Sequence, residues 1–432
     1  MALAYPASAP AASWPAPAGI DLSDPRFWLR PLAERAAAFA RLRAMPGPVW
    51  FPDARVPFVK RSGSWALVRH ADVTEASRNP GIFSSEPTGS AAVDPPRLLN
   101  RYIHSMIDMD DPRHAKIRRT VSRAFSPKML AKIQDDIACR SARIVDELIA
   151  AGPGDFVAQV AARLPVEIIC DMLGIPATYY DQILHHTNMV LGVADAEYTG
   201  ITPDLGRVRT TLGMTKTALA ARHLHQLAAT LGEERRKEPA GDLTSLLVNA
   251  NLDGECLTPR EFGAFFLLLV VAGNETTRTA MTHGLNLLTD HPGQRELLLS
   301  DYDNRIGAAI EEIVRYSTPV IFMRRNLTRD HDMNGHHYQA GDKVLLYYNS
   351  ANRDESVFPG PDTFDITRAP NPHLGFGGPG PHFCLGANLA RRELTIMFRE
   401  LYTRLPGLRA TGEPDRLTSN FINGIKRQPC TF

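Results

Sequence analysis

The sequence lacks paired cysteines, an excess of either charge, and an apolar run long enough to cross a bilayer. Its 432 residues include five cysteines, which are widely spaced and form no CxxC pair. Isolated thiols in odd number exclude a disulfide framework and a cysteine zinc site, and they favour a reducing cytoplasm. The longest uncharged apolar segment, Phe262 to Gly273, falls short of the roughly 18 residues that a membrane span needs. We therefore expect a cytoplasmic protein with no membrane span.

The balance of charge gives no general reason to bind nucleic acid or an acidic membrane surface. There are 48 Lys and Arg against 47 Asp and Glu, so no long-range field of one sign is expected. The first 19 residues carry no charge and are mostly Ala and Pro, which argues against a signal peptide and against a helix. We expect residues 1–19 to be a flexible N-terminal segment and residues 20–432 to form a single domain.

Helical patterns dominate the rest of the chain. Thr258-Pro259-Arg260-Glu261 combines a capping box with proline at the first helical position, and it predicts a helix that continues to Asp290. Such a helix would be about 45 Å long. Pro- and Gly-rich loops with few strands follow from Thr318. The sequence predicts a mainly α fold with small β elements, with further helices at 128–151, 164–173, 179–236 (interrupted at 192–203) and 385–405, and the clearest strand at 343–348.

A loop dense in glycine and proline carries one cysteine, Cys384, to the start of the last predicted helix. The segment reads His373-Leu-Gly-Phe-Gly-Gly-Pro-Gly-Pro-His-Phe-Cys-Leu-Gly386. Unpaired N–H groups at a helix start stabilise a thiolate, and glycines allow backbone to approach the sulfur closely. A buried structural thiol is the alternative, which the density of glycine disfavours. The segment also contains GxGxxG from Gly375 to Gly380, but no strand precedes it, so a dinucleotide site is not favoured.

This loop resembles the haem-ligand loop of the cytochrome P-450 family. Phe376 lies eight residues before Cys384, one more than in the commonest form of the family. The longer loop is similar to that of the actinobacterial branch that acts on methyl-branched lipids and sterol side chains. The resemblance implies a cytochrome P-450 fold, one haem b, and Cys384 as the ligand of its iron.

Further motifs match the family in the same order along the chain. Ala272-Gly-Asn-Glu-Thr-Thr277 resembles the oxygen-activation motif, which implies catalytic roles in proton delivery for Glu275 and Thr276. Polar residues in an apolar helix otherwise bond back to the preceding turn. Glu312-Ile-Val-Arg315 is an ExxR pair that by itself could be a surface ion pair. The resemblance makes it a buried structural triad, which consists of Glu312, Arg315 and Arg368.

The resemblance also implies residues that bind the haem propionates. His114 and Arg118 lie one helical turn apart, in a run from Pro112 to Gln134 that has seven Lys or Arg and no acid. Such a run is normally a solvated helix face. The implied cofactor-binding set is His114, Arg118, Arg325, His382 and Cys384. Because Arg324 is adjacent to Arg325, the sequence does not decide which of these two arginines matches the propionate-binding arginine of the family. Other cations could dock an acidic electron donor or serve only solubility: Arg113, Arg119, Arg123, Arg391 and Arg392.

The implied reaction is the insertion of one oxygen atom from O2 into a C–H bond of a small apolar substrate. The resemblance implies ferredoxin and ferredoxin reductase as electron donors, and terminal hydroxylation of a methyl-branched lipid, an isoprenoid or a sterol side chain. Alternatives are oxidation of a terpenoid or other secondary metabolite, and a haem-thiolate sensor or carrier without turnover. Residues matching the substrate-contact regions are apolar, so a core position is as likely for each of them. They are Ile103, Met106, Val271, Ala272, Val320, Ile321, Phe322 and Phe421.

Overall fold

The computed structural model describes residues 14–54, 62–95, 100, 102–122, 124–126, 129, 131, 133–202, 207–250 and 257–432. Most of the N-terminal segment expected to be flexible lies outside these residues, as do Cys256 and Arg123. No helix of the described part is both long and apolar enough to cross a membrane.

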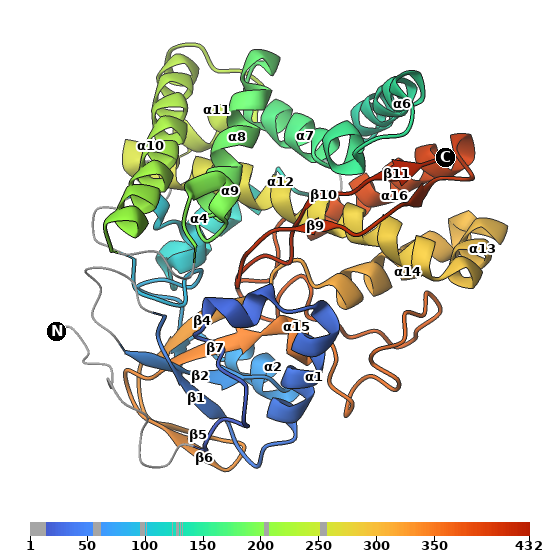
Figure 1. The fold of residues 1–432 in the computed structure, drawn as a ribbon. Coiled ribbons are helices and arrows are strands. Elements are labelled where there is room, and N and C mark those ends of the chain that lie inside the picture. Colours follow the sequence, from blue (N-terminus) through green and yellow to red (C-terminus); the bar gives the residue numbers. More distant parts are fainter. Residues whose placement is uncertain are drawn as a thin grey trace.

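Helices form the larger part of the molecule and confirm the mainly α prediction (Figure 1). The helices are α1 Leu32–Arg43, α2 His70–Arg78, α4 Arg113–Ser122, α6 Gln134–Ala151, α7 Arg163–Leu173, α8 Tyr180–Leu191, α9 Ala196–Thr199, α10 Arg207–Lys237, α11 Leu243–Val248, α12 Pro259–Asp290, α13 Pro292–Ser300, α14 Tyr302–Ser317, α15 Tyr348–Ala351 and α16 Ala387–Arg404.

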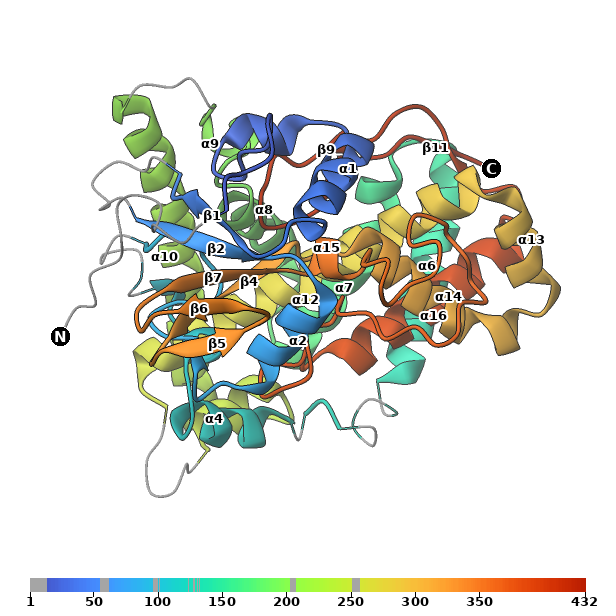
Figure 2. The same ribbon diagram turned by 90° about the horizontal axis from the view of Figure 1, so that it is seen from below.

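The long helix α12 begins as its sequence predicts. The Thr258 side chain accepts a hydrogen bond from the Glu261 N–H, and the Glu261 carboxylate accepts one from the Thr258 N–H. Both bonds satisfy N–H groups that a helix start leaves without partners. The helix crosses the molecule and packs against α7, α10 and α14 (Figures 1 and 2). It therefore supplies side chains to the centre of the fold.

The remaining helix predictions are confirmed with shifts of a few residues at the ends. The break expected at 192–203 lies between α8 and α10, where the short helix α9 is inserted. Helix α6 begins at Gln134, whereas the pattern suggested a start near Lys128; residues 127, 128, 130 and 132 of that interval lie outside the described residues.

One five-stranded sheet joins strands from residues 49–84 with strands from residues 322–347. Its order is β1-β2-β7-β4-β3, in which β2 and β7 are parallel and the other neighbours are antiparallel. Strand β7 confirms the strand expected at 343–348. The strands are β1 Val49–Pro52, β2 Gly63–Leu67, β3 Phe83–Ser84, β4 Phe322–Leu327, β5 His331–Met333, β6 His336–Tyr338, β7 Lys343–Tyr347, β8 Arg409–Ala410, β9 Asp415–Arg416, β10 Ile425–Arg427 and β11 Cys430–Thr431.

Both faces of this sheet are buried, since successive side chains of a strand point to opposite sides. Ala66 and Leu345 pack with α1 residues in one apolar cluster. Trp65, Leu67 and Leu346 pack in another cluster, which includes α2 residues. A larger cluster fills the space among the helices. Two-sided burial makes the sheet a rigid support for the loops that follow its strands.

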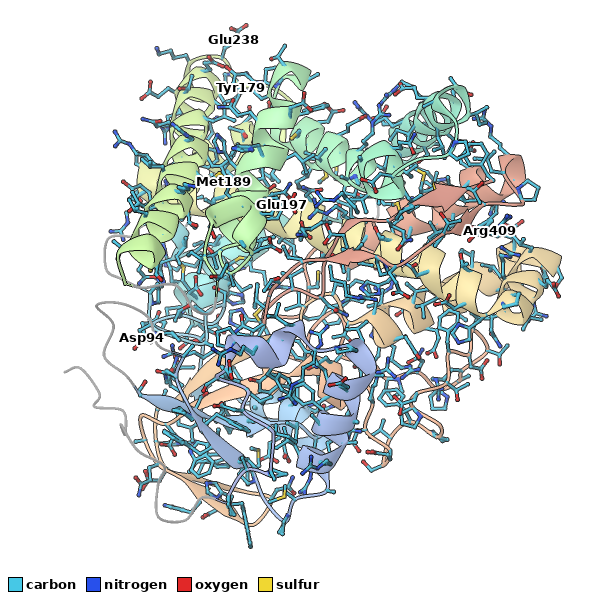
Figure 3. All side chains as sticks on the ribbon, in the orientation of Figure 1. Asp94, Tyr179, Met189, Glu197, Glu238 and Arg409 are labelled. Atoms are coloured by element: carbon cyan, nitrogen blue, oxygen red, sulfur yellow. The ribbon has the colours of Figure 1, made fainter. Side chains whose placement is uncertain are left out.

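The C-terminal strands are tied to the segment between α8 and α10 by ion pairs. Glu197 of α9 accepts hydrogen bonds from the Lys426 ammonium at 2.8 Å and from the Arg427 guanidinium at 2.7 Å (Figure 3). Arg427 also pairs with Asp415 of the adjacent strand at 2.6 Å. These contacts hold the chain end against the helical part of the molecule.

Candidate haem-thiolate site

Cys384 lies at the end of the glycine-rich loop, two residues before the cap of α16. The loop closes through a hydrogen bond of 2.9 Å from the Cys384 N–H to the Phe376 carbonyl. Gly377 and Gly380 adopt φ values of +90° and +150°, which favour glycine. A Cβ atom at Gly378 or Gly380 would collide with Ser77 of α2. Gly378 and Gly380 are therefore required by the packing of the loop against α2. The backbone N–H groups that act on the sulfur belong to Gly386 and Ala387.

The Cys384 side chain opens into a cavity between α12 and the loop. Burial raises the pKa of the Cys384 thiol. The N–H groups of Gly386 and Ala387 and the guanidinium groups of Arg118 and Arg391 act in the opposite direction. The helix start and two cations thus favour a thiolate, as the sequence suggests, but burial outweighs them in the free protein. A metal cation at the sulfur would remove the thiol proton.

His382 and His114 meet beside this cavity. Their ring centroids are 4.3 Å apart, and His382 Nε2 lies 3.0 Å from the Ser85 hydroxyl. Burial, followed by the charge of Arg325, lowers the pKa of His382 to about 2, so its ring is neutral at pH 7. Buried His114 has no hydrogen-bond partner at Nε2 among the described residues. A buried ring nitrogen without a partner is ready to bind an added polar group.

Arg118 and Arg325 line the same cavity. Arg118 donates a hydrogen bond of 2.6 Å to the Phe383 carbonyl. Arg325 is 5% exposed and donates to the Arg324 carbonyl at 2.7 Å, with no carboxylate partner among the described residues. Arg324 instead pairs with Asp94 at 2.7 Å. Of the two arginines, Arg325 lines the cavity and Arg324 does not.

The central part of α12 forms another wall of the cavity. Ala272, Gly273, Thr276 and Thr277 line it. The Thr276 hydroxyl donates to the Ala272 carbonyl at 2.9 Å, which is the local bond to the preceding turn that a helical threonine often makes. A Cβ atom on Gly273 would lie 3.1 Å from Ile169 of α7. The missing side chain therefore allows α7 to approach α12 closely.

Glu275 does not line this cavity. Its side chain is 1% exposed and forms an ion pair with Arg278, one turn along α12. Arg278 also donates a hydrogen bond of 2.9 Å to the Asn188 side chain of α8. Burial raises the pKa of Glu275, and Arg278 acts in the opposite direction. The structure brings Thr276 to the cavity and turns the neighbouring carboxyl group away from it. Arg278 is a partner that the sequence reasoning missed, although it lies at the i+3 spacing of an ion pair.

Three of the eight predicted substrate-contact residues line the cavity: Met106, Ala272 and Val320. Ile321 and Phe322 instead pack in the apolar cluster on the α1 side of the sheet, and Phe421 is packed against it. Ile103 and Val271 are packed against the helical core. Adjacent side chains point to opposite faces of a strand and lie about 100° apart around a helix, so a stretch of apolar residues cannot all face one cavity. Other apolar lining residues went unpredicted: Phe265, Leu268, Leu269 and Met323.

The ExxR pair lies in the core, so the surface alternative is excluded. Glu312 and Arg315 are 0% exposed and share two hydrogen bonds of 2.7 Å. Arg368 reaches the same carboxylate at 3.3 Å, and the Asn371 side chain donates to it at 3.1 Å. The network ties α14 to the chain that leads into the Cys384 loop, and every carboxylate oxygen has a partner.

Several cations of the predicted docking face are engaged within the protein. Arg113 pairs with Glu261 at 2.5 Å, and Arg391 pairs with Glu311 at 2.6 Å. Arg391 also lies over the Phe376 ring, 4.4 Å from its centroid. Arg392 contacts the Gln134 side chain. Arg391 therefore supports the cysteine loop from behind, in addition to adding charge near the sulfur.

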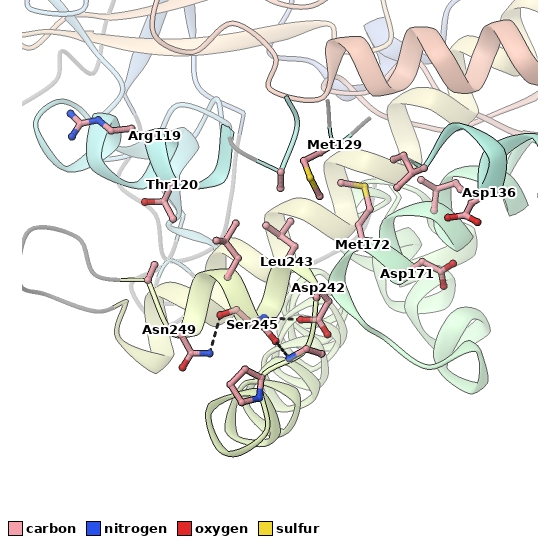
Figure 4. Close-up of a pocket in the computed structure, with 18 of the residues that line it drawn as sticks. Arg119, Thr120, Met129, Asp136, Asp171, Met172, Asp242, Leu243, Ser245 and Asn249 are labelled. Carbon is pink, nitrogen blue, oxygen red and sulfur yellow. Dashed lines mark hydrogen bonds between the residues drawn. The ribbon is translucent and has the colours of Figure 1, made fainter. Parts of the chain in front are cut away.

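A larger pocket lies elsewhere, between α4, α7 and α11 (Figure 4). Among its polar residues, Asp242 caps α11 through the Ser245 N–H and pairs with Arg235. Asp171 pairs with Arg140 and accepts a hydrogen bond from the Tyr180 hydroxyl. Two of its acids are thus occupied in local structure. The described residues that line it include no cysteine or histidine, whereas those of the cavity at Cys384 include both.

Comparison with known proteins agrees with this geometry. Residues 67–405 match the cytochrome P450 family. The chain belongs to the cytochrome P450 family. It is 48% identical to a methyl-branched lipid omega-hydroxylase of Mycobacterium tuberculosis strain CDC 1551 / Oshkosh, over 96% of this chain and 95% of the relative.

Two further relatives are informative. This P450 is 37% identical to a steroid C26-monooxygenase of Mycobacterium bovis, over 95% of this chain and 92% of the relative. A solved structure of a Mycobacterium marinum cytochrome P450 in complex with pseudoionone superposes with a TM-score of 0.91 at 41% identity, covering 98% of this chain and all of that one. The chain is accordingly a cytochrome P450 monooxygenase, and the family implies a haem-thiolate cofactor.

The residues present at the cavity fit this cofactor. The thiol of Cys384 faces the cavity, and among the described residues His114 Nε2 has no hydrogen-bond partner and the buried Arg325 has no carboxylate partner. Haem would supply a metal cation for the Cys384 sulfur and propionate groups for His114 and Arg325. When bound, haem supplies the oxidative chemistry, in which dioxygen is activated and one of its atoms enters a C–H bond.

Proposed function

We propose that this P450 hydroxylates the terminal carbon of a methyl-branched apolar chain. The observation that carries the proposal is the wall of apolar side chains that continues from Phe265 and Leu269 to Thr276 and Cys384. Such a wall offers a hydrocarbon no hydrogen bonds, so it selects by shape and apolar area. Relatives named for methyl-branched lipids and for steroid C26 both oxidise chain ends, which supports the position of attack.

We propose that Cys384 ligates the haem iron and that His114, Arg118, Arg325 and His382 hold the propionates. Arg118 and Arg325 supply positive charge within the cavity, and His114 and the neutral His382 supply ring N–H donors beside it. Glu312, Arg315 and Arg368 support the loop without touching the cofactor. Ferredoxin and ferredoxin reductase are the proposed electron donors, and they would approach the loop from the side of α4.

Thr276 is the proposed hydroxyl that orders proton delivery at the reacting centre. It lines the cavity and already has an acceptor in the Ala272 carbonyl. Glu275 is the neighbouring carboxyl group of the same relay, and its ion pair with Arg278 holds it behind the helix. In Thr276→Ala we expect product per electron consumed to fall about a hundredfold, with hydrogen peroxide released in its place. Unchanged product yield in that variant would favour a haem protein whose threonine is structural.

Haem ligation is tested by the absorption spectrum of reduced protein with carbon monoxide. Cys384→Ala should lose the thiolate-type spectrum, while Cys139→Ala, which removes an exposed cysteine on α6, should retain it. A wild-type protein that cannot be loaded with haem would overturn the assignment.

The substrate class is tested with matched ligands. We expect chains with a terminal isopropyl group to shift the haem spin state and to yield the terminal alcohol. Straight chains of equal carbon number should bind at least about tenfold more weakly. Isoprenoid ketones are a second candidate, because the Mycobacterium marinum relative is solved with pseudoionone. If steroids with the complete ring system were the only compounds converted to product, the preference for a flexible chain would be overturned.

A further inference from the structure

Two arginines from opposite ends of the chain, Arg35 near the start of α1 and Arg416 of β9, have no carboxylate partner. Arg35 is 9% exposed, and its Nε atom is buried without a hydrogen-bond partner. The Nη1 atom of Arg416 is also buried without one. Among the described residues, no hydrogen bond or ion pair to either guanidinium group is found. Both charges are therefore available to a ligand.

The geometry of β9 turns Arg416 toward the interior. Asp415 and Arg416 are its two residues, and successive side chains of a strand point to opposite faces. Asp415 pairs with Arg427 at 2.6 Å, on the side that Glu197 of α9 also contacts. Arg416 points the other way. On that side the adjacent strand β10 packs against α12, and Phe421 of the same hairpin packs against the apolar cluster that includes α1 residues.

The two guanidinium groups lie close enough to repel each other. Burial, followed by the charge of Arg416, lowers the pKa of Arg35 to about 10. His283 of α12 senses both cations: burial, then Arg416, and to a smaller extent Arg35 lower its pKa to about 4, so its ring is neutral at pH 7. The charge of Glu413, an exposed residue, favours the charged form of Arg416, but the two form no ion pair. Positive charge thus collects between α1, β9 and α12.

Packing alone gives no reason for this arrangement. Two like charges brought into buried surroundings without a counter-charge cost free energy, which apolar side chains of similar volume would not. Water can accept the N–H groups but cannot cancel the charge. An oxyanion does both, because its oxygen atoms match the planar fork of a guanidinium group. Neither arginine lines the cavity at Cys384, so haem and a substrate bound beside it do not supply that anion.

We propose that Arg35 and Arg416 form a binding site for one small oxyanion, of the phosphate or carboxylate type, outside the haem cavity. The bound anion links α1 to β9 beside α12. Because Lys426 and Arg427 tie the other side of the same hairpin to Glu197 of α9, the anion completes the attachment of the C-terminal hairpin. The proposal depends neither on the substrate nor on the monooxygenase activity.

The first test measures binding directly. Haem-loaded protein is dialysed against radiolabelled inorganic phosphate, with sodium chloride holding the ionic strength constant, and acetate is tested as a competitor. We expect saturation at one anion per chain, and the tighter of the two anions identifies the class. Arg35→Met and Arg416→Met should each weaken binding at least about tenfold. Arg41→Met, which changes an exposed arginine of the same helix, should bind as wild type. Absence of saturable binding by both anions, or equal binding by all four proteins, would overturn the proposal.

The second test separates anion binding from packing by the order of stabilities. Without phosphate or acetate, Arg35→Met removes a buried repelling charge and keeps most of the apolar stem, so its denaturant midpoint should equal or exceed that of wild type. A saturating concentration of the anion that binds should raise the wild-type midpoint but not that of the variant, so that the order reverses. Arg41→Met should follow wild type in both conditions. A midpoint of Arg35→Met that lies below wild type by the same amount in both conditions would show that Arg35 only packs, and would overturn the proposal.

Discussion

Two buried carboxyl groups near the centre of this P450 have opposite surroundings. Glu275 of α12 has a guanidinium partner and no opening to the cavity, because Arg278 holds it behind the helix. Glu393 of α16 lines the cavity, and its Oε2 atom has no hydrogen-bond partner among the described residues. Burial raises the pKa of both, but only Glu275 has a cation that opposes the rise. A carboxyl group's chemistry is thus set by what surrounds it, and adjacency to Thr276 in sequence does not decide it.

The difference also separates two kinds of contribution to stability. A buried ion pair has been desolvated on both sides, so losing one partner leaves an uncompensated charge. A neutral buried acid leaves no unpaired charge at low pH; its unsatisfied carboxyl group already costs some desolvation free energy, and the cost rises steeply when the group must ionise. The two sites should therefore respond in opposite ways to substitution and to pH.

The largest effect is expected from Arg278→Leu. Removing the cation leaves Glu275 buried and unpaired, which should lower the free energy of unfolding by about 3 to 5 kcal/mol. The double variant Glu275→Leu/Arg278→Leu should recover most of that loss, because no charge is then left without a partner. Denaturant midpoints of the haem-loaded proteins measure the loss in the single variant and its recovery in the double variant. A double variant no more stable than the single one would contradict the pairing.

An effect of similar total size, spread over a defined pH window, is expected from Glu393. Its pKa in the folded protein is about 8, against an ordinary value of 4.5, so between those values the folded state holds a proton that the unfolded state releases. Stability from this group is complete below pH 4.5 and is lost as the pH rises toward 8, by about 1.4 kcal/mol per pH unit.

Glu393→Gln removes that slope, since an amide does not titrate. Unfolding of wild type and variant should be compared at steps between pH 5 and pH 8. The control is Met397→Leu, a volume-conserving change of a buried residue one turn along α16, which should retain the wild-type slope. Parallel curves for wild type and Glu393→Gln would show that the acid is already ionised in the folded protein.

The smallest effect is expected from Asn188→Ala, which removes one partner of Arg278 from α8. A hydrogen bond to a charged group contributes about 1.5 kcal/mol, and the Glu275 pair remains in place. The free energy of unfolding should fall by about that amount. Hydrogen exchange of α8 should rise while that of α16 stays unchanged. An equal rise in both helices would show that the two carboxyl regions are mechanically coupled.

Local signals predicted much of the helical framework. The capping box at Thr258 and the proline that follows place the start of α12 at the predicted residue, because the groups that satisfy a helix start are neighbours in the chain. The break between α8 and α10 was visible for the same reason. The pairing of strand β2 with strand β7 could not be predicted from local signals, because the paired residues lie nearly three hundred positions apart in the chain.

Individual site residues were less predictable than the motif that contains them. Thr276 and Cys384 face the cavity as expected, but Glu275 beside Thr276 does not. Helical geometry turns successive side chains by 100°, and which of them faces the cavity depends on how α12 packs. Ile321 and Phe322 were expected beside substrate, but both pack in the apolar cluster on the α1 side of the sheet.

The sequence by itself pointed to Cys384 as the candidate haem ligand, to the long capped helix and to the ExxR pair, since each is a pattern among near neighbours. Tertiary structure alone decided the remaining questions. It places Arg325 at the cavity and pairs Arg324 with Asp94, and it pairs Glu275 with Arg278. It also places Glu393 on the cavity wall with no partner for its Oε2 atom among the described residues. Burial and charge pairing are properties of segments brought together from distant parts of the chain, and they set the pKa of a carboxyl group far more strongly than its neighbours in sequence do.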